Sequence, residues 1–166
     1  MGGASSLGQY AIQLARLSGF SPIIATASPH NTDLLTSLGA THIIDRKLPP
    51  ATFQEEVRKI TPTPVELGFD TVSYPETQQA LYDVLAPEGK MVVSTPPMVA
   101  PTEDDKKTIL FVNGTFFLPE NKEFGSRLMS ALTRMIAEGE IKVHFNSPYP
   151  HIPPLTILFA FQRRPL

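Results

Sequence analysis

The sequence predicts an α/β protein with a Rossmann-like, doubly wound and mainly parallel sheet. Short β-branched runs alternate with stretches of helical periodicity, which is typical of βαβ units. A glycine-rich turn also leads directly into the first helical stretch, as in dinucleotide-binding folds. Because only Met1 precedes this turn, we expect the sheet to lack its usual first strand.

Each element follows from its local pattern of apolar, capping and turn residues. The expected helices cover residues 7–18, 31–38, 51–60, 76–85 and 121–138, and the expected strands cover residues 22–27, 42–45, 69–73, 90–94 and 109–117. Residues 1–143 are therefore expected to form an incomplete dinucleotide-binding domain. Residues 144–166 form a proline-rich tail, in which closely spaced prolines exclude a regular helix or central strand. Its apolar run, 155–161, could add an edge strand or remain poorly ordered.

The glycine-rich turn is the first candidate site. Small residues let the backbone approach a pyrophosphate, and the first amides of the following helix point at the anion. Ser6 with Gln9 predicts a capping box at the helix start. The candidate cofactor-binding residues here are Ser5, Ser6, Leu7 and Gly8. A plain glycine turn is the alternative, and a nucleophile elbow centred on Ser6 is a remote one.

Composition excludes several classes of function. The net charge is −2, which argues against nucleic-acid binding by electrostatics. No apolar run is long enough for a membrane span, and no signal peptide is evident, so we expect a cytoplasmic protein. The absence of cysteine and the spacing of the four histidines argue against a metal site.

Three ordered segments, residues 2–15, 25–31 and 38–45, resemble the cofactor domain of the medium-chain dehydrogenase/reductase superfamily. Within it, the chain most resembles the zinc-free, NADPH-dependent enoyl reductase-like branch, which includes fungal trans-enoyl reductases. The resemblance covers residues 2–145 and implies binding of NADP(H). Relatives place a GroES-like catalytic domain before this turn, and we expect that domain to be absent from this chain.

The choice of cofactor is argued from the end of the second expected strand. NAD sites place an acidic side chain there, whereas this chain has Ser28, Pro29, His30 and Asn31. Their hydrogen-bond donors suit a 2′-phosphate, and Arg46 could pair with it bidentately. Ser28 or Asn31 could instead cap the next helix, and Arg46 could be a solvated loop charge.

The remaining site residues are implied by the resemblance. Val93 and Ser94 would lie near the nicotinamide, and the candidate substrate residues are Gly114, Thr115, Phe116, Phe117 and Leu118. Phe116 and Phe117 could equally be core residues or part of a strand that pairs across a homodimer. No catalytic acid or base stands out, which suits chemistry that the cofactor itself carries.

These observations support two functions. In the first, the chain is the NADP(H)-binding portion of an oxidoreductase that transfers hydride to an activated alkene, with a small acyl or enone substrate. In the second, it is an inactive Rossmann-like remnant that binds nucleotide or another protein. We expect this chain alone to bind NADPH weakly and to show no turnover of 2-enoyl thioesters or quinones.

Overall fold

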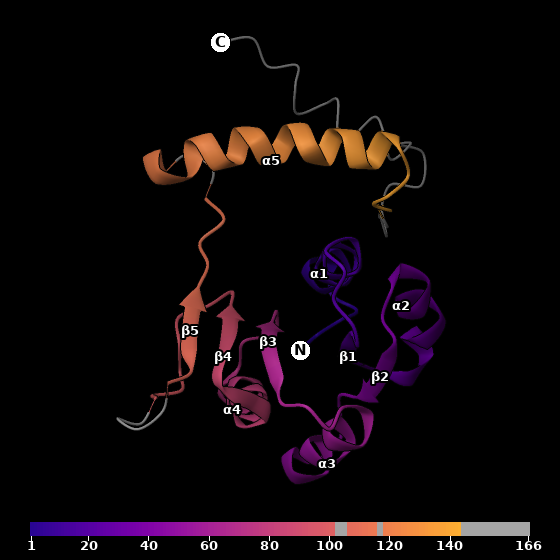
Figure 1. Cartoon of the computed structure of the whole chain (residues 1–166), viewed down its shortest axis with the longest axis vertical. Coiled ribbons are helices and arrows are strands. Elements are labelled where there is room, and N and C mark those ends of the chain that lie inside the picture. The colour runs from indigo at the N-terminus through magenta and orange to yellow at the C-terminus, as the bar shows by residue number, and fades with distance from the viewer. Residues whose placement is uncertain (102–105, 116–117, 144–166) are drawn as a thin grey trace.

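The computed structural model describes residues 1–101, 106–115 and 118–143 (Figure 1). The helices are α1 (Ser6–Leu17), η1 (Pro29–Asn31, a 3₁₀ turn), α2 (Thr32–Leu38), α3 (Pro50–Ile60), α4 (Pro75–Val84) and α5 (Pro119–Ala137). The strands are β1 (Ile24–Ala27), β2 (His42–Asp45), β3 (Val65–Asp70), β4 (Leu85–Val93) and β5 (Thr108–Phe111). The proline-rich tail, with its apolar run 155–161, lies outside the described residues.

The strands form two separate parallel sheets. One has the order β1-β2, with Ile24 opposite His42, and the other has the order β3-β4-β5. In the second sheet Gly68 pairs with Met91, and Met91 pairs with Ile109. All the observed pairings are parallel, as the alternation of strands and helices predicted.

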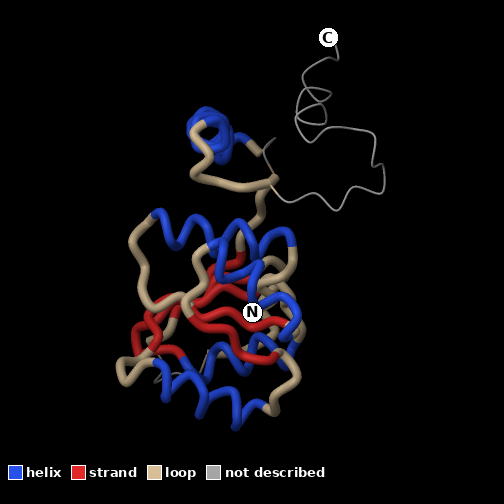
Figure 2. The backbone as a smooth tube through the Cα atoms, turned by 90° about the vertical axis from the view of Figure 1, so that its right-hand side faces the viewer, coloured by secondary structure: helices blue, strands red, loops and turns tan. Residues whose placement is uncertain are grey.

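Helices cover both faces of the strands (Figure 2). Helix α1 packs beside α2, and α3 packs beside α4. Two of the apolar cores lie over the smaller sheet. The first core joins Ile12 of α1, Ala25 of β1 and Leu35 of α2, and another joins Ile44 of β2 to Phe53 of α3. This layered arrangement confirms the predicted α/β fold class.

A gap separates β1 from β3, and the N-terminus lies within it (Figure 1). The Met1 amino group donates to Phe69 O, and Met1 O accepts from Thr71 N at 3.3 Å. On the other side, Gly3 N donates to Thr26 O at 2.9 Å. Residues 1–3 therefore contact the carboxyl ends of both flanking strands, where the usual first strand of the predicted sheet would end.

Several strand boundaries differ from those predicted. β3 begins at Val65 instead of residue 69, and β4 begins at Leu85 instead of residue 90. The strand expected at 69–73 ends at Asp70, because the Asp70 carboxylate accepts the Val72 and Ser73 amides at 2.9 and 3.0 Å and turns the chain. The strand expected at 109–117 covers only Thr108–Phe111. Residues 112–115 are irregular, and Phe116 and Phe117 lie outside the described residues.

Helix α5 lies apart from the strands, beyond the end of β5 (Figures 1 and 2). Gly125 is its one buried residue, while Phe124 and Met129 are exposed. In the described ranges no helix is long and apolar enough to cross a membrane.

Candidate functional site

The glycine-rich turn holds the start of α1 at the carboxyl ends of β1 and β3. Gly2 adopts φ +71°, which turns the chain away from the strands, and its amide donates to Thr26 Oγ1 at 3.1 Å. Ser5, Ser6 and Leu7 are exposed at the helix start. The first amides of α1 therefore lie at the surface, where an anion could reach them.

The helix cap is Ser5, not Ser6 as the sequence predicted. Ser5 has extended backbone, and its Oγ accepts from Gly8 N at 3.0 Å. The same Oγ donates to Gly2 O at 2.8 Å, so one hydroxyl joins the turn to the helix. Gln9 donates its side-chain amide to Ala4 O at 3.0 Å instead of closing a capping box with Ser6. Ser6 is thereby the first helical residue.

Gly8 is required by close packing within the turn. A Cβ at this position would lie 2.3 Å from Gly2 O and 2.8 Å from both Gly3 Cα and Gly3 O. These are backbone atoms that cannot move independently of the turn. The lack of a side chain at Gly8 therefore lets α1 start in direct contact with residues 2 and 3.

The residues predicted to hold a 2′-phosphate gather after β1 and β2. Arg46 Nε donates to Ser28 Oγ at 2.9 Å, and Asn31 Nδ2 lies 3.2 Å from His30 Nε2. Arg46, His30 and Pro29 are exposed. Neither Ser28 nor Asn31 uses its side chain to cap the following helix, so the capping alternative is not supported.

A row of hydroxyl groups continues this edge past β3 and β4, and two of its members, Thr71 and Ser73, were not among the predicted site residues. Thr71 Oγ1 shares a hydrogen bond of 2.9 Å with Ser5 Oγ, and Ser73 Oγ lies 3.3 Å from Ser94 Oγ. Ser73 has φ 56°, an unusual conformation for a residue with a side chain. Thr71 and Ser73 could have been found from the sequence because they directly follow an apolar strand. The prediction of a strand over 69–73 instead placed both residues inside that strand.

Two predicted residues at this edge have different environments. The Val93 side chain is fully buried in the core with Leu81 and Met91, and its carbonyl accepts from Val112 N at 3.0 Å. Ser94 is half-buried and lies at the surface end of β4. Only Ser94 thus presents a side chain near the row of hydroxyl groups.

The candidate substrate residues follow β5. Asn113 Oδ1 accepts hydrogen bonds from the Thr115 amide (3.1 Å) and hydroxyl. Asn121 Nδ2 donates to Thr115 O at 3.0 Å, which ties this segment to α5. Gly114 and Thr115 are exposed, and Leu118 is half-buried. Because β5 is parallel to β4, this segment leaves the sheet at the same edge as Ser94.

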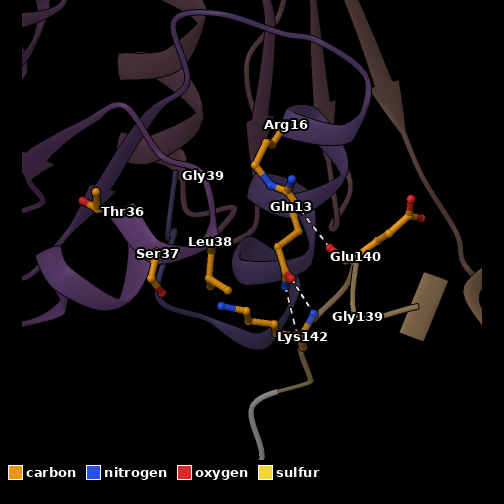
Figure 3. A pocket seen from close by; sticks show the side chains of 9 residues that line it. All are labelled: Gln13, Arg16, Thr36, Ser37, Leu38, Gly39, Gly139, Glu140 and Lys142. Carbon is orange, nitrogen blue, oxygen red and sulfur yellow. Dashed lines mark hydrogen bonds between the residues drawn. The ribbon is translucent and has the colours of Figure 1, made fainter. Parts of the chain in front are cut away.

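A polar hollow of about 340 Å³ lies at the other end of α1 (Figure 3). There the buried Gln13 side chain accepts from Lys142 N at 2.6 Å and donates to Lys142 O at 3.0 Å. Arg16 donates to Glu140 O at 2.8 Å. These bonds attach residues 140–142 to α1, so the hollow is a structural junction remote from the glycine-rich turn.

Comparison with known proteins shows which family the chain belongs to. The family model described as zinc-binding dehydrogenase matches residues 6–138. A zinc-type alcohol dehydrogenase-like protein of Schizosaccharomyces pombe is 34% identical over 131 residues, which cover 76% of this chain and 36% of that protein. A trans-enoyl reductase of Gibberella zeae is 31% identical over 159 residues, covering 86% of this chain and 44% of that protein.

Solved structures agree with the fold. The enoyl reductase CurK has a TM-score of 0.67 at 26% identity and covers 94% of this chain and 47% of its own. A mycobacterial protein complexed with NADPH has a TM-score of 0.70 at 22% identity and covers 86% of this chain and 45% of its own. The chain thus spans less than half the length of these relatives. It belongs to the zinc-binding dehydrogenase family, within the medium-chain dehydrogenase/reductase superfamily, and is similar to the family's enoyl reductases.

Proposed function

We propose that this chain binds NADP(H) and forms the cofactor-binding portion of an oxidoreductase that transfers hydride to an activated alkene. The observation that carries the proposal is the joining of two candidate sites at one sheet edge. Two amides of the glycine-rich turn, those of Gly2 and Gly3, donate hydrogen bonds to Thr26. The second candidate site starts two residues after Thr26, at Ser28, which accepts a hydrogen bond from Arg46. A dinucleotide lying along this edge would meet both sites.

The residues present fit the phosphates of such a cofactor. The exposed amides at Ser6 and Leu7 lie at the positive end of α1 and would bind the pyrophosphate. Ser5 would act indirectly, because its hydroxyl already caps the helix. Gly8 lets the helix start close to the turn.

NADP(H) suits the adjacent residues better than NAD(H). The segment Ser28–Asn31 offers donors and no carboxylate, and Asp33 lies within the first turn of α2. The Arg46 guanidinium carries a permanent charge and keeps donors beyond the one that it gives to Ser28. We infer that Ser28, His30, Asn31 and Arg46 would hold the 2′-phosphate, with Pro29 shaping the turn.

The bound cofactor would supply the hydride, and the chain's residues would position its reactive end. Ser94 follows β4 at the same sheet edge at which the segment that carries Gly114, Thr115 and Leu118 follows the parallel strand β5. We propose that these residues border the acyl or enone substrate, together with Phe116 and Phe117 from outside the described residues. Val93 would support Ser94 from the core.

Zinc has no place in this proposal, although the family's name refers to it. The described residues bring together no group of three His, Cys, Asp or Glu side chains that could hold a metal ion. The chain also contains no cysteine, and cysteine is a common zinc ligand in dehydrogenases. The donor set of the described residues therefore does not fit a zinc ion.

A homodimer through β5 is part of the proposal. Within the described residues β5 is the outer strand of its sheet, and Leu110, Phe111 and Val112 are exposed there. Exposed apolar side chains on an unpaired strand edge favour pairing with another chain. A second copy would bring the same strand and the same side chains.

The deciding experiment is calorimetric titration of the chain with NADPH and NADH. We expect NADPH to bind weakly but better than NADH, and we expect no turnover of 2-enoyl thioesters by this chain alone. Arg46→Met should lower the affinity for NADPH about tenfold or more and leave that for NADH unchanged. Lys47→Met, the matched control at the neighbouring exposed cation, should change neither.

Absence of binding by either nucleotide would refute the proposal for this chain. It would favour the second function, an inactive Rossmann-like module that contacts another protein. The specific observation behind that alternative is that the strands form two separate sheets, β1-β2 and β3-β4-β5, among the described residues. Equal loss of NADPH affinity in both variants would instead indicate a diffuse electrostatic effect.

A further inference from the structure

The loop that follows β3 is held in one conformation by the side chain of Asp70. Its carboxylate is fully buried and accepts the amides of Val72 and Ser73 at 2.9 and 3.0 Å. It also accepts the hydroxyl of Thr77, in the first turn of α4, at 2.7 Å. Because one carboxylate bonds both the loop and the next helix, Thr71 is held at a fixed place at the end of β3.

The hydroxyl of Thr71 contacts the glycine-rich turn directly. Its Oγ1 lies 2.9 Å from Ser5 Oγ, within hydrogen-bond distance. The same atom lies 3.1 Å from Gly2 O and 2.9 Å from Met1 O. A Cβ on Gly2 would lie 2.6 Å from both Thr71 Oγ1 and Val72 Cγ2, so the loop and the turn are already in close contact. This hydroxyl is therefore a polar link between β3 and the turn.

Ser5 extends this link to the start of α1. Its Oγ accepts from Gly8 N at 3.0 Å, and its carbonyl accepts from Gln9 N at 2.9 Å. Two of the first four amides of the helix are therefore occupied. In the part of the chain that the structure describes, the amides of Ser6 and Leu7 have no acceptor, and both residues are exposed. The conformation of Ser5 sets the direction of these two donors.

We propose that Thr71 is a positioning residue for the pyrophosphate of the cofactor. It acts through Ser5 and holds the amides of Ser6 and Leu7 in the direction in which they would bind the anion. This inference rests on the proposed function, to which it adds a residue that lies 66 positions from Ser5 in the chain.

The physical reason is preorganisation. Amides at a helix start bind an anion best when they are already aimed at it, because no binding energy is then used to order the turn. Without the Thr71 hydroxyl, Ser5 Oγ would still bond Gly8 N and Gly2 O but would lose its tie to β3. Binding of a pyrophosphate should weaken, whereas the 2′-phosphate, which would bind at Ser28 and Arg46, should be unaffected.

The test compares two adenosine nucleotides that each carry one of the two anions. ADP has a pyrophosphate and no 2′-phosphate, and 2′-AMP has a 2′-phosphate and no pyrophosphate. In NMR titrations of the 166-residue chain, Thr71→Val should weaken binding of ADP, NADH and NADPH about fivefold and leave that of 2′-AMP unchanged. Arg46→Met should instead weaken binding of 2′-AMP and NADPH and leave that of ADP unchanged.

Two further variants control for the size and type of the substitution. Thr71→Ser keeps the hydroxyl and should restore the affinity for ADP. Thr108→Val makes the same change at an exposed threonine at the start of β5 and should change none of the affinities.

Hydrogen exchange without nucleotide tests the route through Ser5. In Thr71→Val the Gly8 amide should exchange at least about threefold faster, because its acceptor is held less firmly. The Phe53 amide, which donates to Pro49 O at 2.9 Å at the start of α3, is the matched control and should be unchanged. An unchanged Gly8 amide would contradict the proposed route.

The outcomes separate this inference from the proposed function. Unchanged ADP affinity in Thr71→Val, when the unsubstituted chain binds NADPH, would overturn the inference and leave the proposed function standing. Failure of the unsubstituted chain to bind any of these nucleotides would refute both. Equal losses for ADP and 2′-AMP would indicate a general loosening of the fold, and failure of Thr71→Ser to restore binding would assign the effect to side-chain shape. Either result contradicts a role of the Thr71 hydroxyl in positioning.

Discussion

Gly8→Ala tests whether the glycine-rich turn is held together by close packing against α1. The new methyl group would lie 2.3 Å from Gly2 O, whereas ordinary contacts begin near 3.4 Å. The turn must therefore open by about 1 Å, which costs about 1–3 kcal/mol as overpacking. Opening also weakens the cap from Ser5 Oγ to the Gly8 amide, adding about 1 kcal/mol. Better helix propensity returns up to about 1 kcal/mol.

The net expectation is a loss of about 1–3 kcal/mol in the free energy of unfolding, with a melting temperature lower by about 2–4 °C for each kcal/mol. Urea unfolding followed by circular dichroism measures it, and a parallel titration should show weaker NADPH binding. Gly114→Ala is the matched control, since a Cβ there contacts nothing within 4 Å. A Gly8→Ala chain as stable as the unsubstituted chain would refute the packing argument.

Three further predictions concern other parts of the chain. Gln13→Leu should lower the free energy of unfolding by about 1–3 kcal/mol in urea melts, because it leaves the backbone amide and carbonyl of Lys142 without their partner. An unchanged free energy would mean that water replaces the Gln13 side-chain amide. With Met1 retained, as checked by intact mass, stability should rise with pH from the lowered pKa of its buried amino group up to about pH 8, because folding releases that proton. N-terminal acetylation should abolish this rise in melts across the same range, and its persistence would exclude the amino group as the cause. Leu110→Asp should convert the proposed dimer to monomer in sedimentation velocity, and an unsubstituted chain that is already monomeric would exclude the dimer.

The sequence predicted the fold class and most elements to within a residue or two. The strand at residues 42–45 was predicted with the bounds that the structure has, and Gly39 ends α2 with φ 118°, as a glycine after a helical pattern suggests. These elements are short and local, so hydrophobic period and turn residues determine them. Four strand boundaries were poorly predicted: both ends of β3, the start of β4 and the end of β5. The end of β3 at Asp70 depends on a carboxylate that bonds the next turn, and the end of β5 at Phe111 depends on where β4 stops.

Some residues of the candidate site could be predicted from the sequence and others could not. Its residue types and order, from the glycine-rich turn through Ser28 to Arg46, could be seen in the sequence because each follows a strand or leads into a helix. The cap at Ser5 could not be distinguished from one at Ser6, because both hydroxyls precede the helical pattern. Thr71 was missed because its importance comes from a hydrogen bond to Ser5, 66 residues away.

The sequence by itself determined that this chain forms parallel βαβ units with a glycine-rich turn at the start of its first helix. Only the tertiary structure decided how the strands of those units group. β1 and β3 stand apart in two sheets, with Met1 bonded to β3 and Gly3 to β1. The physical reason is that strand pairing joins residues distant in the chain, so local pattern predicts a strand but not which of its edges lacks a partner.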